Sequence, residues 1–434
     1  MVDREEEMKE VTIVGAGLAG SEAAFFLLKK GYKVHLYERR PLVDDGAHTT
    51  DAFGELVCSN SLKSDRLDNA CGLLKEEMRK MDSITMEAAE IARVPGGNAL
   101  AVDRDIFASK ITAKLTSFPN LVLHREEITE LPKGPTIIAT GPLTSESLMN
   151  VLGEVIGEKN LSFFDASAPI IKKDSIDFTK AYFKSRFEQD DGAYINCGFS
   201  KEEYTNFVNE LVNAKKALVH EFDTRYFEGC LPIEVIASRG FETLRHGPLK
   251  PFGLWTEEHP RAYAIAQLRQ DTKLGDYYNL VGFQTNLTYP EQKRVFQMIP
   301  GLEHAEFLRY GLMHRNSYIN APKALNEDLS LKNSPNVYIA GQLSGVEGYV
   351  ESAATGIIAA INLWRKEEGK AFTQAPRCSV IGSLLDYILH AASNKFEPMN
   401  ANWAIVPDSA KEIREQAISK ALQEIESYWR DANE

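Results

Sequence analysis

Cysteine is scarce in this sequence, and it never occurs as a close pair. The five cysteines are an odd number, lie far apart along the 434 residues and form no C-x-x-C motif. This pattern argues against a disulfide framework, a zinc ribbon and a thioredoxin-like redox site. We therefore expect a protein of a reducing compartment, and we predict no metal site.

The sequence also lacks long apolar segments. No window approaches the roughly 20 apolar residues that are needed to cross a bilayer. The first ten residues, MVDREEEMKE, are acidic and lack the basic-then-apolar pattern of a secretory signal. We expect a cytoplasmic protein with no membrane partner.

Positive charge is in deficit, which on its face argues against nucleic acid as a partner. The chain has 49 Lys and Arg against 62 Asp and Glu, for a net charge of −13. The deficit is uneven, because residues 169–335 hold 21 basic and 22 acidic residues and so lie near −1. Charge alone therefore leaves RNA binding open.

The chain begins with a strand–helix–strand pattern. Residues 10–15 (EVTIVG) predict a buried strand, residues 18–30 a helix, and residues 33–38 a second strand. Further along, residues 62–92 and 103–115 have helical patterns, and residues 121–124 and 136–140 predict strands. This order is typical of a parallel α/β sheet.

A glycine-rich motif lies at the first turn of this unit, and each of its parts has a physical role. Gly15 permits the tight turn, Gly17 lets the backbone approach a pyrophosphate, and Gly20 allows close helix–strand packing. The helix start offers free N–H groups to phosphates, and Glu38, which closes the second strand, is placed to accept ribose hydroxyls. The predicted dinucleotide site thus consists of Gly15, Ala16, Gly17, Leu18, Ala19, Gly20 and Glu38.

Two later segments favour tightly bound FAD over a transient nicotinamide. Residues 138–142 (IATGP) end a strand with Gly141, in the manner of flavoproteins that have a second glycine-rich turn. Residues 340–349 lead into a helix whose start would face the ribityl and pyrophosphate groups. Gln342 stands where many flavoproteins have Asp. The candidate residues of this segment are Gly341, Gln342, Gly348 and Tyr349.

The pattern changes between these segments, which predicts an inserted domain. Strand-like runs at 263–268 and 278–283 mix with short helices, and residues 337–341 then return to the sheet. We predict an α/β fold with a Rossmann-like FAD-binding domain of the glutathione-reductase type. Its segments are residues 1–150 and 331–405, with an inserted α+β substrate domain at 151–330. Residues 406–434 predict a C-terminal amphipathic helix, which opens on a capping box of Ser409 and Glu412.

Two cysteines have unusual neighbours. Cys58 precedes a Ser-Asn-Ser run that predicts a helix cap or turn, and Cys230 lies between a glycine and a proline-led strand. Turns beside helix starts lower the pKa of a thiol and make it nucleophilic. The alternative is that each is a small buried hydrophobic residue. We assign the remaining three, Cys71, Cys197 and Cys378, to packing.

The whole sequence resembles the folate/FAD-dependent uracil-5 methyltransferase family (TrmFO). The resemblance runs from about residue 10 to 403 and rests on segments in the same order: GAGLAGSEAA, ELVCSNSLKS, GLLKEEM, VPGGNALAVDR, IIATGPLTSESL, FEGCLPIE, QLRQD, NLVGFQTNL, YGLMHRN, GQLSGVEGYVESAATG and FEPMNANW. The related MnmG (GidA) proteins share the FAD domain, but they are much longer and lack the full series.

This resemblance implies methylation of uridine C5 in RNA, with the T-loop uridine U54 of tRNA as the expected target. Reduced FAD, regenerated by NAD(P)H, would transfer a one-carbon unit from 5,10-methylenetetrahydrofolate. The family analogy makes Cys230 the nucleophile at uracil C6 and Cys58 the base or partner thiol, and the two roles could be exchanged. A thiolate is required because uracil C5 is a poor nucleophile until something adds at C6.

Further residues are candidates for substrate binding. His314 is a candidate for stacking on the folate pterin, with Tyr349 as the alternative, and Arg315 and Asn316 follow His314 in the same segment. Arg315 could hold the folate carboxylate or an RNA phosphate. The candidate phosphate contacts near Cys230 are Arg239, Arg245, Lys250 and Arg269.

Three other functions stay open at this point. The same chemistry could act on a 23S ribosomal-RNA uridine. A non-methylating FAD oxidoreductase would use Cys58 and Cys230 as a redox pair. A subunit of an RNA-modification complex would bind FAD and RNA without transferring a methyl group by itself. The sequence does not give the oligomeric state.

Overall fold

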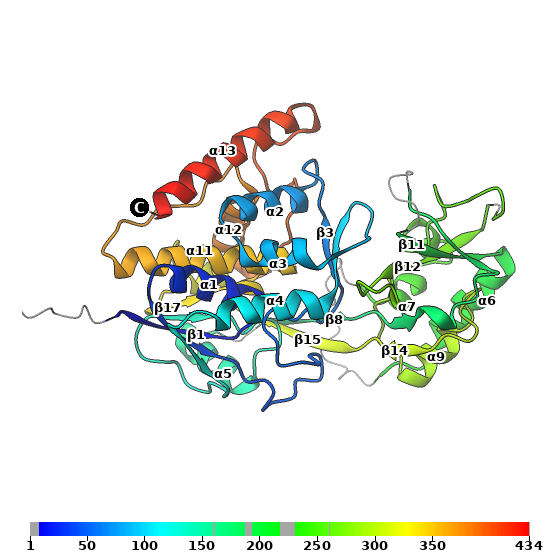
Figure 1. Ribbon diagram of the computed structural model, residues 1–434, viewed down its shortest axis with the longest axis horizontal. Coiled ribbons are helices and arrows are strands. Elements are labelled where there is room, and N and C mark those ends of the chain that lie inside the picture. The colour runs from blue at the N-terminus through cyan, green and yellow to red at the C-terminus, as the bar shows by residue number, and fades with distance from the viewer. Residues whose placement is uncertain (1–7, 159–160, 187–192, 218–230, 260, 434) are drawn as a thin grey trace, which may run out of the picture.

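The computed structural model describes residues 8–158, 161–186, 193–217, 231–259 and 261–433. Figure 1 shows a larger lobe, which contains both ends of the described chain, and a smaller lobe formed by the middle of the chain. A two-stranded antiparallel ribbon of β8 (Leu161–Ala166) and β15 (Met313–Tyr318) lies where the lobes meet. The chain therefore passes into the smaller lobe and back along paired strands.

The larger lobe is built on a six-stranded sheet in the order β16-β17-β7-β1-β2-β6. Five neighbouring strands run parallel, and only the edge strand β16 (Ser330–Leu331) is antiparallel. Val11, Ile13 and Ile137 are almost fully buried in it, as expected for a parallel sheet covered on both faces. The parallel strands are β1 (Glu10–Val14), β2 (Lys33–Tyr37), β6 (Leu121–His124), β7 (Thr136–Ile138) and β17 (Ser334–Ile339).

Helices cover both faces of this sheet (Figure 1). Helices α1 (Leu18–Lys29) and α11 (Tyr349–Glu367) pack closely against each other on one face, while α5 (Glu146–Ile156) lies on the other. A Cβ atom added to Gly356 of α11 would lie 2.2 Å from the carbonyl oxygen of Ala19, so only glycine allows this contact. The helix predicted at 103–115 is α4 (Arg104–Thr116), which the Asp103 side chain caps.

The predicted helical segment 62–92 was wrong in its first part. It begins as β3 (Ser61–Ser64), which belongs to a small antiparallel sheet with β5 (Ala99–Val102) and β4 (Arg93–Val94). Two helices follow, α2 (Ala70–Lys80) and α3 (Ile84–Ala92), and Asp82 between them has a positive φ of 57°. The helical periodicity was therefore real, but it belongs to two shorter helices.

The C-terminal helix packs onto the larger lobe. Helix α13 (Arg414–Asn433) buries Ala421, Ile425 and Tyr428 and places the Trp429 ring 5.8 Å from that of Phe26. The predicted capping box was wrong, because the hydroxyl of Ser409 donates to carbonyls at 403 and 406 and the helix begins five residues later. Helices α10 (Ala321–Ala324) and α12 (Val380–His390) also belong to this lobe.

The smaller lobe has an antiparallel sheet and a core of its own, rich in aromatic residues. The sheet order is β10-β11-β12-β13-β9-β14, and buried rings such as Phe199, Tyr204 and Phe207 pack between it and its helices. The strands are β9 (Ile170–Lys172), β10 (Ala181–Phe183), β11 (Tyr194–Phe199), β12 (Ala264–Gln270), β13 (Tyr277–Leu280) and β14 (Phe307–Arg309). The helices are α6 (Lys201–Asn213), α7 (Ile233–Ser238), α8 (Thr243–His246) and α9 (Tyr289–Phe296).

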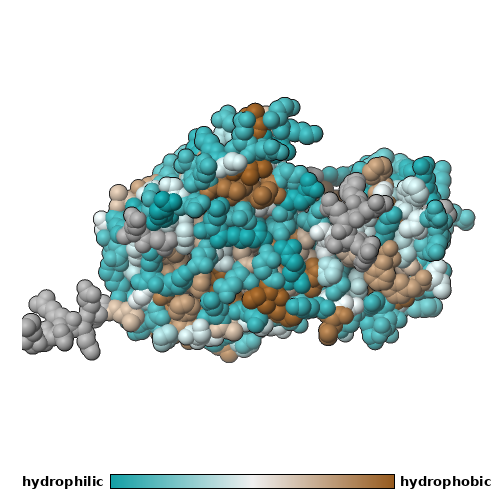
Figure 2. Space-filling view, turned by 45° about the horizontal axis from the view of Figure 1, so that its top comes forward, coloured by the Kyte–Doolittle hydropathy of each residue, from teal (hydrophilic) through white to brown (hydrophobic). Residues whose placement is uncertain are grey.

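The surface is mostly polar. Figure 2 shows a largely hydrophilic face with small, separate hydrophobic patches. Among the residues that the structure describes, no helix combines the length and the apolar character needed to cross a membrane.

Candidate active site

The glycine-rich turn between β1 and α1 is closely packed on one side and open on the other. Gly15 has φ +100°, and a Cβ there would lie 2.5 Å from the carbonyl oxygen of Ala139. A Cβ on Gly20 would lie 1.8 Å from the carbonyl oxygen of Gly15. Gly17 has nothing within 4 Å of its Cβ position. Gly15 and Gly20 therefore serve the packing of the turn, while Gly17 faces open space.

That open space is a cavity of about 370 Å³ at the carboxyl ends of β1, β7 and β17. Ligands of α/β sheets bind at this edge, and the volume lies in the range of small-molecule sites. Most of the predicted cofactor residues line it: Gly15, Gly17, Leu18, Ala19, Glu38, Gly141, Gly341, Gln342, Gly348 and Tyr349. Ala16 and Gly20 do not, because both are buried in the turn.

Glu38 is bound on both carboxylate oxygens. The backbone N–H of Ala16 donates to one oxygen at 3.1 Å, and the Arg40 side chain donates to both at 2.9 and 3.1 Å. These bonds hold the pKa of Glu38 below its usual value, although burial acts to raise it. Glu38 is thus an ionised residue of the cavity wall, and a ribose hydroxyl would share it with Arg40.

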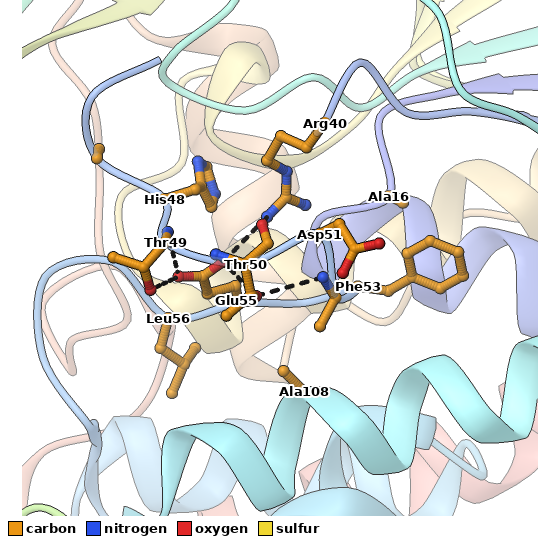
Figure 3. Close-up of polar contacts among 12 residues, drawn as sticks. Ala16, Arg40, His48, Thr49, Thr50, Asp51, Phe53, Glu55, Leu56 and Ala108 are labelled. Carbon is orange, nitrogen blue, oxygen red and sulfur yellow. Dashed lines mark hydrogen bonds and ion pairs between the residues drawn. The ribbon is translucent and has the colours of Figure 1, made fainter. Parts of the chain in front are cut away.

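The loop that leads to Cys58 is fixed by a buried carboxylate, Glu55 (Figure 3). The backbone N–H and hydroxyl of Thr49 donate to one oxygen of Glu55, both at 2.8 Å. Thr50 donates to the other oxygen in the same way, and Arg40 reaches that oxygen at 3.2 Å. Arg40 therefore connects the Cys58 loop to Glu38 at the nucleotide end of the cavity.

Cys58 lines the same cavity, at the end away from Glu38. Its backbone N–H donates to the hydroxyl of Tyr349 at 2.7 Å, and its Sγ lies 3.4 Å from the carbonyl oxygen of Ala166. No helix starts after the Ser-Asn-Ser run, which leads into β3 instead. Burial, and next the negative charge of Asp165, raise the pKa of the Cys58 thiol. The expectation of a lowered pKa at a helix start was wrong here.

Side chains from the β8–β15 ribbon, which connects the two lobes, complete this end of the cavity. His314 and Asn316 of β15 line it together with Asp165 of β8 and with Glu347. Asn316 Oδ1 is buried and has no hydrogen-bond partner among the described residues. Burial lowers the pKa of His314, so its ring is neutral at pH 7. A buried polar atom without a partner is rare in a folded protein.

The sequence did not single out two carboxyl groups of this cavity. Glu347 accepts a hydrogen bond from the side chain of Gln342 at 2.5 Å, and burial raises its pKa well above the usual range. Asp165 is the residue before the last of β8, and its Oδ2 lies 3.8 Å from Nε2 of His314. Glu347 lies two residues before Tyr349 in a segment already recognised, whereas nothing local marked Asp165.

The remaining residues predicted from the sequence have different outcomes in the structure. Cys230 lies outside the described residues, and so does the side chain of Arg315, whose backbone pairs with β8. Arg269 is buried and donates to the side chains of Ser59 and Asn60, so it anchors the Cys58 loop and cannot serve as an exposed phosphate contact. Cys71 and Cys197 are buried. Within the described ranges, no group of three or more His, Cys, Asp and Glu residues is arranged to hold a metal ion.

The residues of the cavity fit a dinucleotide such as FAD. Gly17 leaves room for a pyrophosphate at the α1 N-terminus, and the polar side chains of His314 and Asn316 line the other end. A parallel sheet with helices on both faces, this turn and this cavity define a dinucleotide-binding protein of the Rossmann type.

Comparison with known proteins identifies the family within this class. The family described as "Glucose inhibited division protein A" (GIDA) matches residues 10–371. The proteins named methylenetetrahydrofolate--tRNA-(uracil-5-)-methyltransferase TrmFO of Lactobacillus delbrueckii subsp. bulgaricus and Listeria monocytogenes are 52% and 53% identical, over 94% of this chain and 93% and 94% of theirs. The chain therefore belongs to the TrmFO family, within the wider GIDA family.

Solved structures agree on the fold. Aquifex aeolicus GidA, in its form II crystal, superposes with a TM-score of 0.72 over 98% of this chain and 73% of that one, at 16% identity. Its form I crystal gives a TM-score of 0.69. The GidA chain is the longer of the two, whereas the TrmFO relatives match this chain over nearly their full length. The predicted family and the predicted Rossmann-like fold are thus confirmed.

Proposed function

We propose that the protein methylates carbon 5 of a uridine in RNA, with tRNA as substrate and U54 of the T-loop as the target. FAD and 5,10-methylenetetrahydrofolate are its cofactor and one-carbon donor, and NAD(P)H is the reductant. The observation that carries this proposal is a single cavity lined by the dinucleotide turn and by Cys58. Relatives about 52% identical have names that state a methylenetetrahydrofolate-dependent methylation of uracil C5 in tRNA.

In this proposal the nucleotide end of the cavity holds FAD. The free N–H groups at the start of α1 and the open face of Gly17 receive the pyrophosphate. Tyr349 and Gln342 border the ring system and the ribityl chain. Bound FAD supplies the redox and one-carbon-transfer chemistry that no side chain of the cavity offers.

The other end of the cavity holds the groups that act on the uracil and the folate. We assign the attack on uracil C6 to Cys230, with Cys58 as its partner, as the sequence predicts. His314 and Asn316, which line the cavity, are the proposed contacts of the folate pterin.

Removal of the C5 proton needs a base whose pKa lies near the working pH. Burial raises the pKa of Glu347 well above that of an ordinary carboxyl. Burial also raises the pKa of the Cys58 thiol, which keeps this thiol protonated near neutral pH. Glu347 and Cys58 both line the cavity, and we propose that one of the two accepts the C5 proton.

The direct test is methylation of RNA in vitro. The purified protein is incubated with FAD, deuterium-labelled methylenetetrahydrofolate, NADH or NADPH, and either a tRNA transcript or 23S ribosomal RNA, and labelled 5-methyluridine is mapped by mass spectrometry. Label at the tRNA T-loop is the expected result. Label only in ribosomal RNA would keep the chemistry and change the substrate. Absence of label from both RNAs, in a protein with reducible FAD, would reject the proposal in favour of an oxidoreductase or a complex subunit.

A matched pair of variants separates chemistry from binding. Cys58→Ser should abolish labelling and retain FAD, whereas Cys378→Ser, a change outside the cavity, should retain both labelling and FAD. Equal labelling by both variants would remove Cys58 from the reaction.

A further inference from the structure

The smaller lobe has a second large cavity, which shares no lining residue with the nucleotide cavity. It is a groove of about 870 Å³ between the ends of β10 and β11 and residues 245–259 and 261–263. Five basic residues and one acidic residue line it, in a chain whose net charge is −13. The basic residues are Lys180, Lys201, Arg245, Lys250 and Arg261, and the acidic one is Glu258. Lys180 and Arg245 form ion pairs with Glu303 and Glu242, so the excess of positive charge comes from Lys201, Lys250 and Arg261. Such a local excess on an acidic protein is informative, because the rest of the chain repels polyanions.

Two large aromatic side chains are exposed on the rim of this groove. Phe252 is 65% exposed and Trp255 is 50% exposed. Each has a cation nearby, with Lys250 Nζ 5.7 Å from the centre of the Phe252 ring and the Arg261 guanidinium 5.9 Å from that of Trp255. Neither Lys250 nor Arg261 forms an ion pair with any residue that the structure describes. Exposed rings interleaved with free cations are the composition of sites that bind nucleic-acid strands.

The segment that contains these two rings is held in place by hydrogen bonds from other side chains to its backbone carbonyl groups. Arg186 donates to the carbonyl oxygens of Lys250 and Phe252 at 2.7 and 2.9 Å. The hydroxyl of Tyr182 donates to the carbonyl oxygen of Leu254 at 2.7 Å, and its ring stacks on His259 with centroids 4.2 Å apart. The exposed rings therefore sit on a fixed platform, which reduces the entropy lost when a base stacks on them.

Strand β12 connects the groove with the Cys58 loop. Its first residue follows Tyr263, which lines the groove, and its last residues, Arg269 and Gln270, bond to Ser59 and Asn60 beside Cys58. Seven strand residues span about 20 Å, because a strand rises about 3.3 Å per residue. That distance corresponds to roughly six stacked nucleotides at 3.4 Å each.

We propose that this basic–aromatic groove binds the substrate RNA about 20 Å from the Cys58 end of the catalytic cavity, an inference that rests on the proposed function. Unpaired bases stack on Phe252 and Trp255. Backbone phosphates contact Lys201, Lys250 and Arg261. The groove thus fixes a part of the RNA several nucleotides away from the reacting uridine.

The test is the affinity of the full-length protein for a fluorescently labelled, unmodified tRNA transcript, measured by anisotropy at several salt concentrations. The double variant Phe252→Ala/Trp255→Ala should raise Kd about tenfold or more with little change in the salt dependence, since stacking is not ionic. Lys250→Gln/Arg261→Gln should weaken binding and lower the slope of log K against log salt by about one to two.

Two exposed residues far along the chain from the groove provide matched controls. Phe372→Ala and Lys395→Gln remove a ring and a cation of similar exposure and should leave Kd unchanged. Flavin content and melting temperature of each variant check that it folds. Binding to tRNA by both groove variants as tight as that of the wild type would overturn the proposal.

Crosslinking of the unaltered protein avoids any effect of the variants on folding. A tRNA transcript containing 4-thiouridine should crosslink to peptides within residues 245–263, and crosslinks confined to other peptides would overturn the proposal. Binding of fluorescent polyglutamate that depends on the groove, with tRNA binding unaffected, would instead assign the groove to an acidic protein segment. If the wild type methylates no RNA but the groove variants still lose tRNA affinity, the proposed function fails and the groove assignment stands.

Discussion

The two ends of the candidate active-site cavity are built in different ways. The nucleotide end is made mainly of backbone, from turns that follow β1, β7 and β17, where Gly15, Gly17 and Gly341 leave space. The cysteine end is made of side chains that come from distant parts of the chain, including Cys58, Asp165 and His314.

This difference explains which substitutions each end of the cavity tolerates. It also explains how far each end could be recognised from the sequence. At the nucleotide end, the constraint on substitutions is steric, because any side chain larger than that of glycine adds atoms to the turn or to the cavity. At the cysteine end, it is electrostatic, because burial keeps the Cys58 thiol protonated and leaves His314 neutral. Variants can therefore test each end with a separate readout, namely stability and flavin content at one end and reactivity at the other.

The largest effect should follow from filling the packed side of the glycine turn. Gly20→Val would place a Cβ 1.8 Å from the backbone oxygen of Gly15, which no side-chain movement can relieve. We expect the free energy of unfolding to fall by about 4 kcal/mol or more in urea denaturation. Gly17→Ala is the matched control and should cost less than about 1 kcal/mol. Equal losses for the two variants would contradict the packing described here.

The contrast between the two ends also shows what the sequence could predict. The strand–turn–helix at residues 10–38 was predictable because its glycines and its helix are local, and β1, α1 and β2 are found there. The pairing of Cys58 with Tyr349 was not, because it joins residues 291 positions apart. The start of β3 at Ser61 was missed because tertiary pairing with β5 overrides the helical pattern that follows.

A larger side chain on the open side of the glycine-rich turn should prevent FAD binding without destabilising the fold. Gly17→Val adds atoms where the pyrophosphate would lie, since nothing else occupies that space. We expect the Kd for FAD to rise about 100-fold or more, with the melting temperature within a few degrees of that of the wild type. Flavin absorbance after gel filtration measures the loss. A yellow, stoichiometrically loaded variant would move the cofactor away from this turn.

At the cysteine end, Cys58 should react slowly with alkylating agents. Its folded pKa is raised, so the thiolate fraction at pH 8 is smaller than in the unfolded chain, and the rate should keep rising with pH through pH 10. We expect alkylation of the Cys58 peptide by iodoacetamide at pH 8 to be at least about tenfold slower than in urea. A rate that levels off near pH 8.5 would show an ordinary thiol and contradict the account.

The smallest effect should come from removing one hydroxyl. Tyr349→Phe deletes the acceptor of the backbone N–H groups of Cys58 and Ser59, at a cost of about 1 kcal/mol in the free energy of unfolding. Tyr310→Phe is the matched control, because its hydroxyl has no hydrogen bond to any described residue. Equal stability of the two variants would show that this bond does not hold the Cys58 loop.

The central claim is that one cavity brings a dinucleotide and Cys58 together. The most direct measurement is a crystal structure of the protein purified with its flavin and soaked with a folate. The account predicts the pyrophosphate at the N-terminus of α1, beside Gly17, and the isoalloxazine ring at the end of the cavity that holds Tyr349 and Cys58. A flavin bound elsewhere, or one whose ring points away from Cys58, would contradict it.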